Sequence, residues 1–89
     1  MIVGAIAKLA DAFTETEIDD EVVLMRLDNG EFFSMTGTGR DIWRLIDGSR
    51  DRDAIVASLV AEFDGPADEI GADVDAYLAR LRDAGLVTP

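Results

Sequence analysis

The sequence predicts an α+β fold in which a three-stranded antiparallel meander is followed by three helices. Strand-like apolar runs separated by turn residues fill the first half, apolar residues at helical spacing fill the second, and no repeat or long linker divides them. With 89 residues, all elements must share one core, because so small a domain buries only about 60–65% of its unfolded surface.

The strands are expected at residues 12–18, 21–27 and 31–36. The first alternates weakly ("AFTETEI"), the second is a stronger strand ("EVVLMRL"), and Asp19-Asp20 marks the turn between them. Asn29-Gly30 predicts a two-residue type I′ hairpin, since that turn needs positive φ at both central residues. The expected pairs are Leu27 with Phe32, Arg26 with Phe33, Met25 with Ser34 and Leu24 with Met35.

This pairing makes both faces of the hairpin apolar. One face holds Val23, Met25, Leu27 and Phe32, and the other holds Val22, Leu24, Phe33 and Met35. An antiparallel sheet with one covered face normally alternates apolar and polar residues. The excess of apolar positions therefore favours a binding role.

The first helix is expected to begin at Thr38, which forms a candidate capping box with Asp41, and to end before Gly48. Its apolar side consists of Ile42, Trp43, Leu45 and Ile46.

Asp51 is expected to cap the second helix, and Asp64-Gly65-Pro66 breaks it, so that Pro66 begins the third. The second helix carries apolar residues at helical spacing: Ile55, Val56, Leu59, Val60 and Phe63. The third carries Ile70, Val74, Tyr77, Leu78 and Leu81 on one side, stops at Gly85, and lets Leu86 fold back.

Residues 1–11 are expected to form a mobile or loosely docked N-terminal arm, and residues 12–89 the domain. The apolar opening has no basic region before it and is interrupted by Lys8 and Asp11. It is too short for a membrane span and poorly patterned for a signal peptide. We therefore expect a cytoplasmic protein with no membrane partner.

The composition argues against catalysis and metal binding. The chain has no cysteine and no histidine, so Ser34, Ser49 and Ser58 have no histidine to activate them. The DxD pairs at 51–53 and 73–75 would diverge by about 200° on a helix and cannot converge on one ion. We expect no enzymatic activity, no cofactor and no metal.

Nucleic acid is an alternative partner, because a hairpin beside three short helices resembles a winged helix. The charges of the third helix oppose this interpretation: Asp68, Glu69, Asp73, Asp75 and Asp83 face only Arg80 and Arg82. The whole chain carries a net charge of −11 and repels phosphates. We expect no nucleic-acid partner, and a winged-helix-like DNA-binding or homodimerising regulatory module remains the alternative function.

The strand at 31–36 is expected to be the last of the meander and to leave one edge unpaired. Natural edges are usually blunted by charge, but here Glu31 is followed by Phe-Phe-Ser-Met. An apolar edge beside an amphipathic helix is the geometry of peptide capture by strand addition. The alternatives are that both phenylalanines belong to the core, or that two copies pair edge to edge as a homodimer.

Three stretches together resemble the PqqD-like family: "VVLMRLDNGEFFSMTGTGRDIWRLIDG", "DAIVASLVAEFD" and "DVDAYLARLRDAGLV". These are small leader-peptide-binding proteins, called RiPP recognition elements, of pathways that modify ribosomally made peptides. The resemblance runs from about Ala12 onward. Its most specific parts are the aromatic strand, Thr38-Gly39, Ile42-Trp43 and Ala84-Gly85-Leu86.

The resemblance implies a winged-helix-like arrangement in which a precursor's leader adds as a fourth strand to the Glu31–Thr36 edge, beside the third helix. The implied adaptor presents the attached peptide to a modifying enzyme: a protease, a cyclase or a radical enzyme. The implied peptide-binding residues are Glu31, Phe32, Phe33, Ser34, Met35 and some of Val74, Tyr77, Leu78 and Leu81.

Which of Phe32 and Phe33 faces the groove stays open, although register with Met35 directs Phe33 to the core and leaves Phe32 for the groove. The strand departs from the Leu-Asn that the family often has at Met35-Thr36. It looks closer to the strand of stand-alone chaperones from lasso-peptide clusters.

Overall fold

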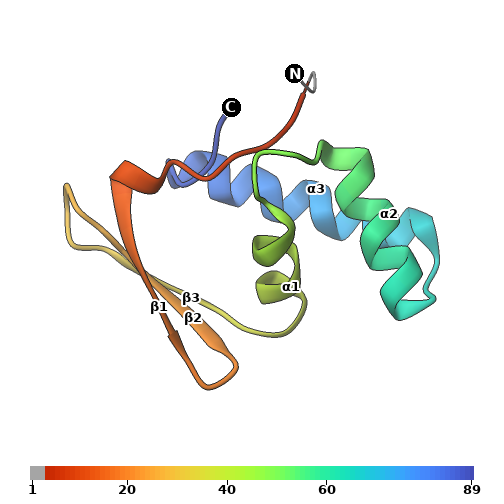
Figure 1. Cartoon of the computed structure of the whole chain (residues 1–89), viewed down its shortest axis with the longest axis horizontal. Helices are drawn as coiled ribbons and strands as arrows, with labels where there is room; N and C mark the ends of the chain where they lie inside the picture. Colours follow the sequence, from red (N-terminus) through yellow and green to blue (C-terminus); the bar gives the residue numbers. More distant parts are fainter. Residues whose placement is uncertain (1–3) are drawn as a thin grey trace.

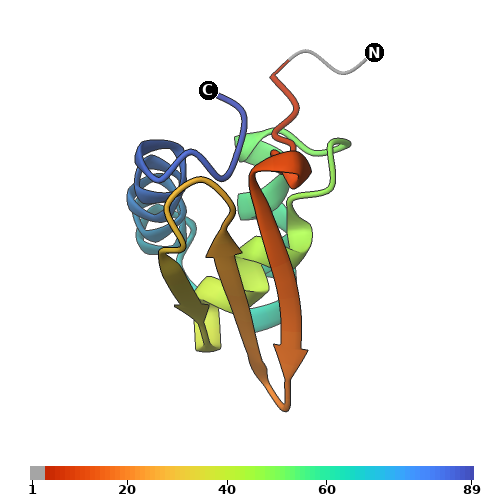
Figure 2. The same ribbon diagram turned by 90° about the vertical axis from the view of Figure 1, so that its left-hand side faces the viewer.

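The computed structural model describes residues 4–89 and contains the predicted meander followed by three helices (Figure 1). The elements are the 3-10 turn η1 (Ala10–Ala12), strands β1 (Phe13–Ile18), β2 (Glu21–Arg26) and β3 (Phe32–Met35), and helices α1 (Gly37–Leu45), α2 (Arg52–Phe63) and α3 (Ala67–Asp83). The antiparallel strand order β1-β2-β3 confirms the predicted fold class. The helices lie on one face of the sheet, and Figure 2 looks onto the other face.

The β2–β3 hairpin differs from the prediction by two residues in its register. Met25 lies opposite Phe32, and Leu24 lies opposite Phe33. The two-residue type I′ turn does not form, because Gly30 has a positive φ of 71° but Asn29 does not. A shift of two preserves the side-chain alternation of the strands, so each residue still lies on its predicted face.

A longer loop replaces the tight turn. The Arg26 N–H donates to the Glu31 carbonyl at 2.9 Å, and the Gly30 N–H donates to the Arg26 carbonyl at 2.9 Å. The Asn29 side chain accepts from the Glu31 N–H at 3.0 Å. Asn29 therefore stabilises the loop through its side chain and has no need of positive φ.

The core lies between the inner face of the sheet and the three helices. Val22 and Leu24 of β2 are almost fully buried there, together with Trp43 of α1. The Trp43 ring meets the Phe13 ring edge-on at 5.5 Å between centroids, and its Nε1 donates to the Glu15 carboxylate at 3.2 Å. α1 is thus attached to β1 by both packing and a hydrogen bond.

The ends of the helices agree with the sequence in part. α1 begins at Gly37, before the predicted Thr38, because Gly37 takes a φ of 57° that turns the chain directly from β3 into the helix. No side-chain capping bond forms at that end, so the predicted capping box is wrong. The predicted cap of α2 is confirmed, since the Asp51 carboxylate accepts from the Ala54 N–H at 2.8 Å.

α3 begins one residue after Pro66 and ends at Asp83, just before the predicted stop at Gly85. The Gly85 N–H donates to the Arg82 carbonyl and the Leu86 N–H to the Leu81 carbonyl, both at 3.0 Å. These two bonds form a Schellman motif, for which the positive φ of Gly85 is needed. The motif returns Leu86 to the core, where it is fully buried.

Residues 4–11 of the expected N-terminal arm are docked on the rest of the chain. Ile6 is buried in the core, and the Leu9 N–H donates to the Leu86 carbonyl at 2.9 Å. This part of the arm runs beside the C-terminal tail (Figure 1). Residues 1–3 of the expected arm lie outside the described residues.

Candidate functional site

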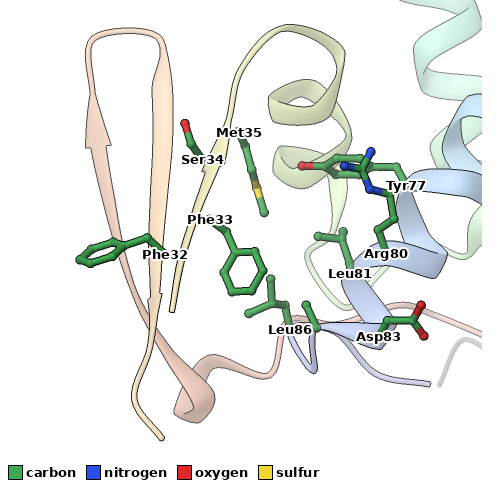
Figure 3. A pocket seen from close by; sticks show the side chains of 10 residues that line it. Phe32, Phe33, Ser34, Met35, Tyr77, Arg80, Leu81, Asp83 and Leu86 are labelled. Atoms are coloured by element: carbon green, nitrogen blue, oxygen red, sulfur yellow. The ribbon is translucent and has the colours of Figure 1, made fainter. Parts of the chain in front are cut away.

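A groove of about 520 Å³ lies between β3 and the C-terminal half of α3 (Figure 3). Its lining residues are Phe32, Phe33, Ser34, Met35, Tyr77, Arg80, Leu81, Asp83, Ala84 and Leu86. A second hollow of about 380 Å³ shares Met35 and Tyr77 with it and continues to Thr38, Gly39 and Ile42 of α1. The groove therefore follows β3 along its whole length.

In the part of the chain that the structure describes, the edge of β3 that faces the groove has no strand partner. Among the described residues, β3 pairs with β2 alone. The bond from Arg26 N–H to the Glu31 carbonyl fixes which residues bond to β2, because such residues alternate along an antiparallel ladder. By this alternation, Phe32 and Ser34 direct their N–H and C=O groups outward, toward the groove.

The side chains that enter the groove belong to the other two residues of β3. Phe33 and Met35 point into the groove, toward Leu81 and Leu86 (Figure 3). Phe33 is half-buried and packs against the core, whereas Met35, Leu81 and Leu86 are buried. The wall beside the free edge is therefore apolar.

Phe32 contributes its backbone to the groove but not its ring. The ring is 69% exposed and points to the other side of the sheet (Figure 3). The Ser34 hydroxyl likewise leaves the groove and donates to the Glu21 carboxylate. The expectation that the Phe32 side chain enters the groove is thus wrong. Phe33 packs against the core as expected, but it also lines the groove, because the inner face of the sheet opens into the groove at β3.

Tyr77 forms the middle of the opposite wall and packs against α1. A Cβ atom at Gly39 would lie 3.0 Å from the Tyr77 hydroxyl, so the ring sits directly on the helix backbone. Burial raises the pKa of the Tyr77 phenol, and the charge of Arg80 opposes this shift. The phenol therefore stays neutral at physiological pH and can both donate and accept a hydrogen bond.

α3 carries two stripes of residues, one facing the core and one facing the groove. The sequence-based prediction assigned residues of both stripes to the groove. The core stripe consists of Gly71, Val74, Leu78 and Leu81. The groove stripe consists of Tyr77, Arg80, Leu81 and Ala84, which follow the helical spacing i, i+3, i+4, i+7. Val74 and Leu78 are 0% and 1% exposed, so they support the groove from the core and do not line it.

The remaining predicted residue, Glu31, is exposed and precedes β3, outside the groove lining. The prediction missed Arg80, Asp83, Ala84 and Leu86. Helical spacing could have found Arg80 and Ala84, which lie three and seven residues after Tyr77. Arg80 and Asp83 are exposed, and they bring one cation and one carboxylate to the rim.

Within residues 4–89, no group of His, Cys, Asp and Glu side chains is arranged to hold a metal ion. No helix in this part of the chain is long and apolar enough to cross a membrane.

The sequence matches the family described as coenzyme PQQ synthesis protein D (PqqD) over residues 21–87. The solved structure of TbiB1 in complex with the TbiA(beta) leader peptide is 31% identical, with a TM-score of 0.81 over 90% of this chain and 93% of that one. Lasso peptide synthetase B1 complexed with the leader peptide has a TM-score of 0.83 over 96% and 99% of the two chains. At 16% identity it supports the fold alone. No curated protein sequence matches this one.

The family match covers β2, β3 and all three helices, including both walls of the groove. It confirms the resemblance that the aromatic strand and the Thr-Gly, Ile-Trp and Ala-Gly-Leu motifs predicted. This chain belongs to the PqqD family.

Proposed function

We propose that this chain binds the leader of a ribosomally made precursor peptide as a fourth strand on β3. It then acts as a non-catalytic adaptor that presents the attached peptide to a modifying enzyme. The observation that carries this proposal is the unpaired edge of β3, which opens on an apolar groove. The 31% identity with TbiB1, solved with a leader peptide, supports the same function.

The groove suits an extended peptide. Phe32 and Ser34 offer their N–H and C=O groups to the added strand, which supplies affinity independent of sequence. Every second leader side chain would then enter the groove against Phe33, Tyr77 and Leu81. Selectivity would come from how these side chains fit the apolar walls.

Apolar contacts are needed because the leader must become ordered on binding, which costs about 2–5 kcal/mol. In return, a tethered substrate reaches an effective concentration near mM at the enzyme. The likeness of the aromatic strand to lasso-peptide chaperones supports a lasso-peptide pathway, with a protease, cyclase or radical enzyme as the partner.

A scan with N-methylated peptides tests the strand addition. The probe is a labelled synthetic leader peptide, beginning with the TbiA(beta) leader, and each amide is methylated in turn. Methylation removes one hydrogen-bond donor, so we expect affinity to fall about tenfold at every second residue of the bound segment. Fluorescence polarisation would measure the affinities. Loss without a period of two residues would contradict strand addition.

Side-chain variants test the groove separately. Phe33→Ala and Tyr77→Ala remove ring contacts from the two walls, and each should weaken leader binding at least about tenfold. Phe63→Ala is the matched control, because this ring is 51% exposed on α2, away from β3. Unchanged affinity in both groove variants would remove the groove as the binding site.

A further inference from the structure

Among residues 4–89, no helix covers the outer face of the sheet (Figure 2). This face carries a patch of apolar residues. We define this outer patch as Val23 and Met25 of β2, Leu27 after β2, and Phe32 of β3. Met25 lies opposite Phe32 in the ladder, and Val23 and Leu27 have the same alternation as Met25. Leu27 is 57% exposed and Phe32 is 69% exposed, so the patch is open to solvent.

The charge of this face and of the whole chain indicates which kind of partner can bind the outer patch. The other strand positions of this face are Thr14, Thr16, Ile18, Glu21 and Ser34, none of which is basic. The chain as a whole carries a net charge of −11. A second copy would bring the same negative charge to the interface, whereas a surface with basic residues around an apolar centre is complementary.

The patch is continuous with the edge where the leader would add. Phe32 is both a patch residue and one of the two residues whose backbone groups face the groove. The leader side chains that do not enter the groove would emerge on the outer face beside Phe32, because side chains alternate along a strand. Leader binding would thus enlarge the patch.

We propose that the outer patch, extended by the leader's outward side chains, is the docking surface for the modifying enzyme, which meets it with an apolar centre and a basic rim. This inference rests on the proposed function. On this proposal the enzyme distinguishes the adaptor with bound leader (loaded) from the adaptor without leader (empty). Only the loaded adaptor presents the whole docking surface.

The test uses Met25→Thr with Leu27→Thr, two patch positions that do not line the groove. Threonine keeps the strand propensity and removes most of the apolar surface. Phe63→Thr on α2 is the matched control, because its exposure of 51% is close to the 57% of Leu27. Leader affinity is measured with the labelled synthetic leader. Enzyme affinity is measured with each purified candidate enzyme (a protease, a cyclase and a radical enzyme), on the adaptor with bound leader and on the adaptor without it.

In the double variant we expect enzyme affinity for the loaded adaptor to fall at least about tenfold while leader affinity stays within about twofold. The wild-type enzyme should bind the loaded adaptor more tightly than the empty one. Its binding should weaken in about 1 M salt, where charges are screened beyond about 3 Å.

Unchanged enzyme affinity in the double variant would overturn the proposal, as would equal affinity for loaded and empty adaptor. An equal loss of leader and enzyme affinity would also overturn the proposal, because it would mean that the patch residues take part in leader binding. A concentration-dependent mass that the double variant abolishes would assign the patch to a second copy instead. Failure of the wild-type chain to bind the leader would appear in the first measurement and count against the proposed function itself.

Discussion

At the scale of single residues, the shape of the groove depends on the missing side chain of Gly39. A Cβ atom there would lie 3.0 Å from the hydroxyl of Tyr77 and 3.1 Å from two of its ring carbons. The ring is half-buried between α1 and α3 and borders the groove, so a displaced ring would move into the groove. The Thr38-Gly39 pair of the sequence thus has a packing role, in which glycine allows the close approach of a groove wall.

Gly39→Ala should therefore push the Tyr77 ring from its place and weaken leader binding by about fivefold, or about 1 kcal/mol. The fold should persist, because alanine is the better helix former by about 1 kcal/mol. Polarisation with the labelled leader measures the affinity, and thermal unfolding checks the fold. In a Tyr77→Ala background the effect should vanish. An equal loss in that background would mean that Gly39 does not act through Tyr77.

The two phenylalanines of β3 show what alternation in a strand can and cannot predict. It placed Phe33 on one face with Met35, and Phe32 on the other. It could not show that the inner face opens into a groove at Phe33 and Met35, because that depends on where α3 lies beside the sheet edge. The face of a residue was therefore predictable, and its role was not.

At the scale of elements, an exposed ion pair joins α3, one wall of the groove, to α2. The Arg52 guanidinium donates to both carboxylate oxygens of Asp75, at 2.8 Å and 2.9 Å. These bonds lower the pKa of the Asp75 carboxyl below its ordinary value of 3.8. A carboxyl whose pKa is lower in the folded state than in the unfolded state favours folding. The pair therefore stabilises the protein at pH values above the ordinary pKa of Asp75, and this stabilisation is lost as the pH falls through the lowered pKa.

Asp75→Asn should lower the unfolding temperature slightly at pH 7, since exposed ion pairs contribute little. The difference from wild type should disappear as the pH falls well below 3.8, where Asp75 becomes protonated and the pair is absent in both proteins. Circular dichroism melts over a pH series measure this difference. Glu62→Gln is the control, because Glu62 makes no ion pair within the described chain. A difference that persists in acid would mean that Asp75 stabilises the fold by another route.

The helices also show what the spacing of apolar residues can and cannot predict. Spacing predicted the existence and order of α1, α2 and α3, and the local chemistry of Asp51 and Gly85 predicted a cap and an end. It did not separate the two stripes of α3, since Val74 and Tyr77 lie three residues apart on adjoining faces. Only the position of β3 decides which stripe meets the groove.

At the scale of the whole molecule, the docked arm is the main feature that the sequence did not predict. Its fixed position depends on pairing with the other end of the chain, where Lys8 forms an isolated bridge with Val87. Local pattern carries no information on such a contact. The Lys8 ammonium also lies 4.5 Å from the centroid of the Trp43 ring, which brings the arm to the same core residue as the sheet.

Trp43 is therefore the residue through which the arm, the sheet and α1 depend on one another. Its ring is fully buried and contacts Phe13 of β1, while its Nε1 bonds to Glu15. Truncation of such an aromatic side chain costs about 3–5 kcal/mol, against a total stability of about 5–15 kcal/mol for a typical domain. A domain of 89 residues has a small core and belongs at the lower end of that range.

Trp43→Ala should consequently unfold the whole domain and abolish leader binding, although Trp43 does not line the groove. Far-ultraviolet circular dichroism and the labelled leader measure the two effects. Trp43→Phe should keep the fold with reduced stability, because it retains an aromatic ring but loses the bond to Glu15. A well-folded Trp43→Ala variant that still bound the leader would show that the sheet and helices hold the groove without this residue. The coupling of arm, sheet and α1 through one side chain would then be wrong.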